Sequence, residues 1–244
     1  MSEPGRPGGA ERGPEEASEY DRLFYPELFG GVREDLRALL DQVRRSTVEK
    51  AEETVALRRD LWQRDQARIV EVAKVMAAAF ARGAVLLALG NGGSSTDAQD
   101  LASELSWPCL PGWRPLPALV LTHDVAAVTA IANDVGFENI FVRQVIAFGR
   151  PGDIAFGIST SGNSANVLAG LVQAKRQGLI TIGLSGYDGG EMARSPAVDY
   201  CITVTNQHVP RIQEGQATVY HTLIALVQRI LAEAAVAPAA RAGA

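Results

Sequence analysis

Two loops rich in glycine and hydroxyl residues are best suited to hold a charged ligand. The first, 90-GNGGSSTD-97, follows the apolar run 85–89, and the second, 159-STSGNS-164, follows the apolar run 154–158. A helical pattern starts directly after each loop. Glycine lets the backbone approach a ligand, hydroxyls donate hydrogen bonds, and the first turn of a helix offers unpaired N–H groups. The loops therefore favour a phosphate group, although the same residues also occur as ordinary N-caps in tight strand-to-helix connections.

The kind of phosphate compound is narrowed by what the loops lack. The segment 90–97 has no Lys-Ser/Thr ending of a Walker A loop. Neither loop follows the full dinucleotide fingerprint. ATP and NAD are therefore disfavoured, and a phosphorylated small molecule is the expected ligand.

These loops are positioned by a repeated pattern of strands and helices. Helical patterns separate most of five apolar segments, at 84–89, 117–122, 153–158, 179–184 and 199–204. Two helices or one broken helix are expected between Val32 and Gly83, and a last long helix near Val209. Continuous apolar strands between helices indicate a parallel sheet covered on both faces. Ligands bind such sheets beyond the carboxyl ends of the strands, where both loops lie.

Composition sets the class of protein. The 244 residues are 47% hydrophobic and carry a net charge of −5, without a run of Lys and Arg that would favour nucleic acid. We expect one domain over 31–235, with disordered ends at 1–30 and 236–244. No segment has the apolar length of a membrane span or a signal peptide, so we expect a cytoplasmic protein without a membrane partner. Cys109 and Cys201 are then expected to be plain thiols.

The order of five motifs is characteristic of a known family. They are GNGGSSTDAQDLASEL, TAIANDVGFENIF, GDIAFGISTSGNSANVL, GLSGYDGG and RIQEGQATVYHTLI. Over roughly residues 33–232 the chain resembles the phosphoheptose isomerases of the SIS (sugar isomerase) family. The resemblance implies an α/β fold with a doubly wound, five-stranded parallel sheet, flavodoxin-like, with extra N-terminal helices. It also implies homotetramers with active sites between subunits, and conversion of D-sedoheptulose 7-phosphate to D-glycero-D-manno-heptose 7-phosphate.

Such an isomerisation moves a proton between neighbouring carbons through an enediol. It needs one group that takes the C–H proton and another that serves the oxygens. The resemblance assigns the first role to Glu104 and the second to His221. Taken alone, Glu104 is equally typical of a solvated helix face, and His221 of a core histidine among apolar neighbours. The position of Glu104, one helical turn after Asp100, favours a functional role.

The resemblance also assigns binding residues. The phosphate contacts are Ser159, Thr160, Ser161 and Ser164. The sugar contacts are Asn91, Gly92, Gly93, Asn133, Asp134 and Gln213, and Ser94 adds a further hydroxyl. Asp134 is also a common N-cap or turn residue, and Arg211 with Glu214 forms only a local ion pair in this interpretation.

A metal site follows from the resemblance with one departure. Its ligands are Asp100, Glu104, Gln213 and His221, and the family has His where this chain has Asp100. A carboxylate in place of imidazole shifts preference from zinc toward oxygen-preferring ions such as magnesium or manganese. Zinc remains the expected ion, bound more weakly. Two further departures, Pro210 and the segment 107-WPCLPGWRPLP-117, predict altered sugar specificity.

Two alternatives belong to other functional classes. Some proteins similar over the same motifs are non-catalytic tetramers that bind a bacterial replication initiator, and they lack the base-and-acid pair that Glu104 and His221 form here. Others sense a sugar phosphate beside a DNA-binding domain, for which this chain has no helix-turn-helix or basic segment. The retained pair favours the isomerase.

Overall fold

The computed structural model describes residues 36–236. The segments expected to be disordered, 1–30 and 236–244, lie outside these residues except for Val236, which ends the last helix. The chain divides into two compact units, Met1–Ala51 and Glu52–Ala244. No helix in the part of the chain that the structure describes is long and apolar enough to cross a bilayer.

A single helix, α3 (Leu36–Ala81), precedes the first strand. The expectation of two helices or a broken one was wrong. Its 46 residues contain neither proline nor glycine, the residues that most strongly interrupt a helix. In the second unit several of its apolar side chains, including Leu61 and Val72, are buried. In the first unit Leu40 and Val43 are exposed.

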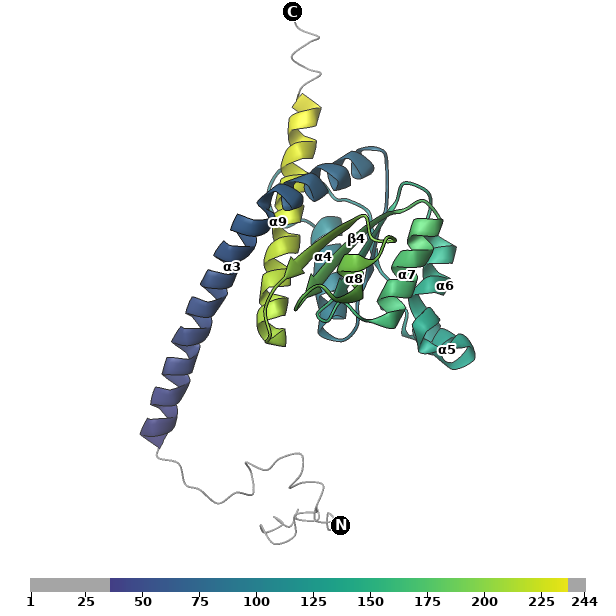
Figure 1. Ribbon diagram of the computed structural model, residues 1–244. Coiled ribbons are helices and arrows are strands. Elements are labelled where there is room, and N and C mark those ends of the chain that lie inside the picture. Colours follow the sequence, from purple (N-terminus) through teal and green to yellow (C-terminus); the bar gives the residue numbers. More distant parts are fainter. Residues whose placement is uncertain (1–35, 237–244) are drawn as a thin grey trace, which may run out of the picture. The chain divides into compact units, whose positions relative to one another are not determined.

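The second unit contains a five-stranded parallel sheet, as expected (Figure 1). Its strand order is β2-β1-β3-β4-β5. The strands are β1 (Leu86–Leu89), β2 (Ala118–Val120), β3 (Ile154–Ser159), β4 (Ile180–Gly186) and β5 (Tyr200–Val204). Every pair of neighbours is parallel, with register such as Leu86 opposite Ile154.

Helices cover both faces of the sheet. One face packs against the part of α3 that lies in the second unit, α4 (Gly93–Ser106) and α9 (Val209–Val236). The other packs against α6 (Ile140–Phe148), α7 (Ala165–Arg176) and α8 (Gly190–Arg194) (Figure 1). Alternate residues of β1 join opposite cores, Leu86 on one face and Leu87 on the other. The doubly wound architecture is confirmed.

One helix of this unit is apolar yet unburied. Helix α5 (Val125–Val135) follows β2 and leads through a short 3₁₀ turn, η2 (Phe137–Asn139), into α6. Its sequence, VAAVTAIANDV, is mainly apolar, but none of its residues is buried. Val125 is 66% exposed. Within one chain α5 therefore leaves apolar surface uncovered.

Candidate active site

The two Gly/Ser loops follow β1 and β3, the neighbouring strands between which the strand order of the sheet reverses. Strands β1 and β3 are neighbours, but the chain leaves β1 toward α4 on one face and β3 toward α7 on the other. A crevice at such a switch point is the usual ligand site of an open α/β sheet. The side chains of Asn91 and Asn166 join the two sides through reciprocal 2.8 Å hydrogen bonds. Asn166, which the sequence analysis did not single out, thus fixes the first loop against α7.

The second loop is a tight hydroxyl-lined turn. Ser159 Oγ lies 2.8 Å from Ser164 Oγ and 3.5 Å from Ser161 Oγ. Gly162 has φ +66°, and a Cβ there would collide with the carbonyl oxygen of Gly189. The turn therefore requires glycine. Helix α7 begins at Ala165, directly after the loop, with Ser164 as N-cap.

Three polar side chains converge between α4 and α9. On α4, Asp100 and Glu104 are four residues apart and share one face. From α9, His221 Nε2 lies 3.3 Å from Asp100 Oδ2 and 3.9 Å from Glu104 Oε1. One candidate ligand atom from each residue lies within 4.8 Å of the others. The structure thus brings together the predicted base Glu104, the predicted acid His221 and Asp100, which stands where the family has a histidine.

The hydrogen bond on the far side of His221 determines which nitrogen can react. Nδ1 lies 2.8 Å from the carbonyl oxygen of Ala217, which can only accept, so Nδ1 carries a proton. In the neutral imidazole Nε2 is then the unprotonated nitrogen, and it faces the two carboxylates. This nitrogen is suited either to exchange a proton or to bind a cation.

A third carboxylate, Asp97, lies on the same side of α4. Its Oδ2 atom is buried without a hydrogen-bond partner among the described residues. Burial raises the pKa of Asp97 to about 6, opposed by a hydrogen bond from the Gln213 side chain. The Gln213 amide also lies against Gly93, where a Cβ would collide with Nε2. Gln213 is thereby held at the start of α4, beside the cluster.

Asp97 was not among the predicted site residues, although its spacing from Asp100 and Glu104 is visible in the sequence. Asp97, Asp100 and Glu104 follow the i, i+3, i+7 spacing of one helix face, beside the buried Leu101 and Leu105. The helix dipole favours acidic side chains only in the first turn of a helix, so it does not account for three acids along one stripe of α4. The spacing alone predicts a shared polar surface.

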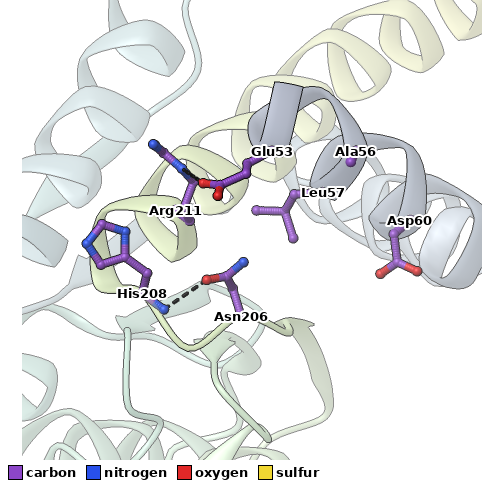
Figure 2. A pocket seen from close by; sticks show the side chains of 7 residues that line it. All are labelled: Glu53, Ala56, Leu57, Asp60, Asn206, His208 and Arg211. Atoms are coloured by element: carbon purple, nitrogen blue, oxygen red, sulfur yellow. Dashed lines mark hydrogen bonds and ion pairs between the residues drawn. The ribbon is translucent and has the colours of Figure 1, made fainter. Parts of the chain in front are cut away.

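Arg211 fixes the start of α9. Its side chain is only 5% exposed and donates to Glu214 at 2.6 Å and to Glu53 of α3 at 3.1 Å. Thr54 donates to the same Glu214. The expected Arg211–Glu214 pair is present, but it is more than local, because it ties α9 to α3. Figure 2 shows Arg211 and Glu53 at one edge of a hollow of about 560 Å³ that also includes His208.

The remaining predicted sugar contacts have mixed surroundings. Gly92, with φ +52°, caps α4, and Ser94 is 5% exposed in its first turn. Asn133 and Asp134 lie exposed on α5 and hydrogen-bond to each other at 2.9 Å. Among the described residues, no hydrogen bond joins this pair to the crevice or to the α4–α9 cluster.

Comparison with known proteins decides the family. The SIS domain family profile matches residues 51–186. The phosphoheptose isomerase of Nitratidesulfovibrio vulgaris is 44% identical over 195 residues, which cover 80% of this chain and 93% of that protein. The structure of a phosphoheptose isomerase from Neisseria gonorrhoeae has a TM-score of 0.70 and 33% identity, with coverage of 76% and 98%. One from Francisella tularensis has a TM-score of 0.71 and 30% identity, with coverage of 78% and 98%.

The chain belongs to the phosphoheptose isomerase family of SIS domain proteins. Membership confirms the expected fold and makes the chain a phosphosugar isomerase of the aldose–ketose type. The relatives match over nearly their whole length, so the resemblance extends well beyond the phosphate loop.

The α4–α9 cluster of this phosphoheptose isomerase family member has the donor set of a divalent-cation site. Two carboxylates and an imidazole nitrogen with an exposed lone pair all face one another. Without a proton or cation among them, these acceptor atoms repel one another. The residues therefore fit a bound metal ion, with Gln213 adjacent to them through Asp97.

Proposed function

We propose that this phosphosugar isomerase converts D-sedoheptulose 7-phosphate to D-glycero-D-manno-heptose 7-phosphate. The observation that carries the proposal is the convergence of Glu104 with His221 Nε2 beside Asp100, on helices that begin at the sheet's carboxyl edge. Relatives named phosphoheptose isomerase, including one from Geotalea daltonii at 48% identity, support a heptose phosphate as substrate.

The two catalytic residues have complementary roles in this proposal. Glu104 removes the proton from C1 of the open-chain ketose, and the unprotonated Nε2 of His221 takes the proton of the hydroxyl at C1 and passes it to the oxygen at C2, which gives the enediolate. Glu104 then returns its proton to C2, and the carbonyl group forms at C1. Each group ends in its starting state, as a catalyst must.

The phosphate is held away from the reacting carbons. Ser159, Thr160, Ser161 and Ser164 and the first turn of α7 supply its donors, and the loop contains no Lys or Arg. Asn91, Gly92, Gly93, Ser94, Asn133, Asp134 and Gln213 are proposed to contact the sugar. Of these, Asn91 is hydrogen-bonded to Asn166 in the first turn of α7, directly after the second loop.

A metal ion is part of the proposal. Asp100, Glu104, Gln213 and His221 would hold it, and when bound it would stabilise negative charge on the enediol oxygens. We propose zinc, bound more weakly than by a His-bearing relative because a carboxylate replaces an imidazole. Metal analysis of protein purified without chelator, with activity before and after EDTA, tests this. Full activity in metal-free protein would show that proton transfer does not need the ion.

The proposal also includes an oligomer. The apolar side chains exposed on α5, and on the part of α3 that lies in the first unit of the chain, support contact with further copies of the chain. We propose a homotetramer with active sites between subunits. An assembled state would also bring exposed residues such as Asn133 to a neighbouring copy.

The test is direct turnover. Incubation with sedoheptulose 7-phosphate should give an aldose signal by NMR, and Glu104→Gln should lower turnover by about 10²–10⁴-fold, because it removes a positioned base. Glu233→Gln, an exposed acid near the end of α9, is the control and should keep activity. No aldose from wild-type protein, or near-normal turnover by Glu104→Gln, would contradict the assignment.

A further inference from the structure

Tyr220 occupies a position between the hydrophobic core and the α4–α9 cluster. Tyr220 is 2% exposed, and its ring packs within the core formed by α3, α4, α9 and the sheet. Its hydroxyl reaches out of this core and donates a 2.7 Å hydrogen bond to Asp100 Oδ2. The ring also lies beside the imidazole of His221, with centroids 4.5 Å apart.

The hydroxyl can act only as a proton donor to this carboxylate. A phenol ordinarily ionises only near pH 10, so the hydroxyl carries its proton at neutral pH and is the donor in this bond. The oxygen that it binds, Asp100 Oδ2, is the same atom that lies 3.3 Å from His221 Nε2. A carboxylate oxygen has more than one lone pair, so this bond leaves capacity for a further partner.

Asp100 needs such a partner more than a histidine would. An imidazole binds a metal through one ring nitrogen, and a hydrogen bond from its other ring nitrogen fixes the orientation of the ring. An aspartate is shorter, its carboxylate rotates broadly about χ2, and about half of this side chain is exposed. Apart from His221, Tyr220 is the one group among the described residues that makes a polar contact with Asp100. The phenol thus restricts an otherwise mobile ligand.

We propose that Tyr220 is a positioning residue that holds the Asp100 carboxylate as a metal ligand. The proposal rests on the metal site of the proposed function. In this chain Asp100 of α4, oriented by Tyr220 of α9, takes the place of the histidine that serves as metal ligand in the family. The tyrosine is inconspicuous in the sequence because it lies within the apolar run 219–224 of α9.

The test measures metal affinity rather than turnover alone. Tyr220→Phe keeps the packed ring and removes only the hydroxyl. It should weaken zinc binding, measured by competition with a chromophoric chelator, by about 10–100-fold, the usual effect of losing an outer-sphere partner of a metal ligand. Tyr200→Phe, the same change on β5, should bind zinc as wild type does. The melting temperature of each metal-free variant checks that the fold is retained.

A double-mutant cycle shows whether the effect passes through Asp100. In an Asp100→Ala background, Tyr220→Phe should change zinc affinity less than 2-fold. In an Asp100→His background, the tyrosine should likewise become dispensable. An unchanged affinity in Tyr220→Phe, an equal loss in the Asp100→Ala background, or a wild-type protein that binds no zinc would each overturn the inference. The isomerase assay on wild-type protein is independent, so failure of the proposed function is recognised separately.

Discussion

Three acids and one histidine determine the chemistry of the α4–α9 cluster. Asp97 is largely enclosed, whereas Asp100 and Glu104 face His221. Burial raises the pKa of the Asp97 carboxyl, because it penalises the charged form. The two carboxylates that face His221 are the available ligands and bases, and Asp97 is suited to hold Gln213.

The pKa of Asp97 predicts a pH effect on metal-free protein. Its folded-state value of about 6 lies above the ordinary 3.8, so the protonated form is favoured by folding. The stabilisation is therefore complete below about pH 4 and is lost as the pH rises through 6. After allowance for solvent screening of a partly exposed group, the loss is about 1 kcal/mol, or about 2–4 °C in melting temperature.

Calorimetry of EDTA-treated protein between pH 5 and 7 checks this effect. Wild-type protein should lose stability relative to Asp97→Asn across this interval, because the amide does not ionise. A constant difference between the two melting temperatures would show that Asp97 titrates normally.

The residue scale is also where sequence reasoning reached its limit. Glu104 and His221 were predicted together from a family resemblance, and the structure places them side by side. Tyr220 was not, because its contact with Asp100 depends on the register between two helices 120 residues apart in sequence. No local pattern encodes that register. Only the packing of α4 against α9 does.

At the scale of elements, the sequence was more informative. All five strands were predicted within about two residues, because continuous apolar runs bounded by polar turns mark buried parallel strands. The continuity of α3 was missed, and two helices or a broken one were expected instead. The absence of proline and glycine over 36–81 was the better guide.

The loop between β3 and α7 yields a prediction about substrate affinity. Ser161→Ala with Ser164→Ala removes two hydroxyls while Gly162 preserves the turn. We expect KM for the sugar phosphate to rise by about 10-fold or more, at about 0.5–1.5 kcal/mol per hydrogen bond, with a smaller change in kcat. Thr47→Ala, an exposed hydroxyl on α3, is the control. Unchanged KM in the double variant would make the loop structural only.

Asp199 gives a stability prediction for the opposite end of the sheet. It accepts hydrogen bonds from the Thr181 N–H and hydroxyl and pairs with Lys175, thereby joining β4, β5 and α7. Burial alone would raise the pKa of Asp199, but these donors outweigh it and lower the value. Its contribution is therefore present at neutral pH and lost as the pH falls below about 4.

Asp199→Asn should accordingly lower the free energy of unfolding at pH 7 by about 1–2 kcal/mol. Asp188→Asn, at a largely exposed carboxylate paired with Arg194, should leave the free energy of unfolding nearly unchanged. Urea titrations measure both. Equal effects of the two variants would contradict a special role for Asp199.

At the scale of the whole molecule, the exposed apolar surface remains to be explained. The stripe Leu39, Leu40 and Val43 has the spacing of a core-facing helix, yet each side chain is at least 40% exposed. Helix α5 shows the same mismatch between composition and burial. A sequence predicts that such faces are buried, but not whether the same chain or another copy covers them. Oligomeric state therefore cannot be predicted from periodicity.

Charging that stripe tests the proposed tetramer. Leu40→Asp with Val43→Asp places two carboxylates where a second copy should pack, and burying unpaired charges in an interface is strongly unfavourable. Light scattering after gel filtration should give four chains for wild type and a smaller species for the double variant. Arg44→Asp, on the same helix at an exposed polar position, should remain assembled. Because the active sites are proposed to lie between subunits, the dissociated variant should also lose turnover. A wild-type monomer with full activity would refute both the assembly and the shared site.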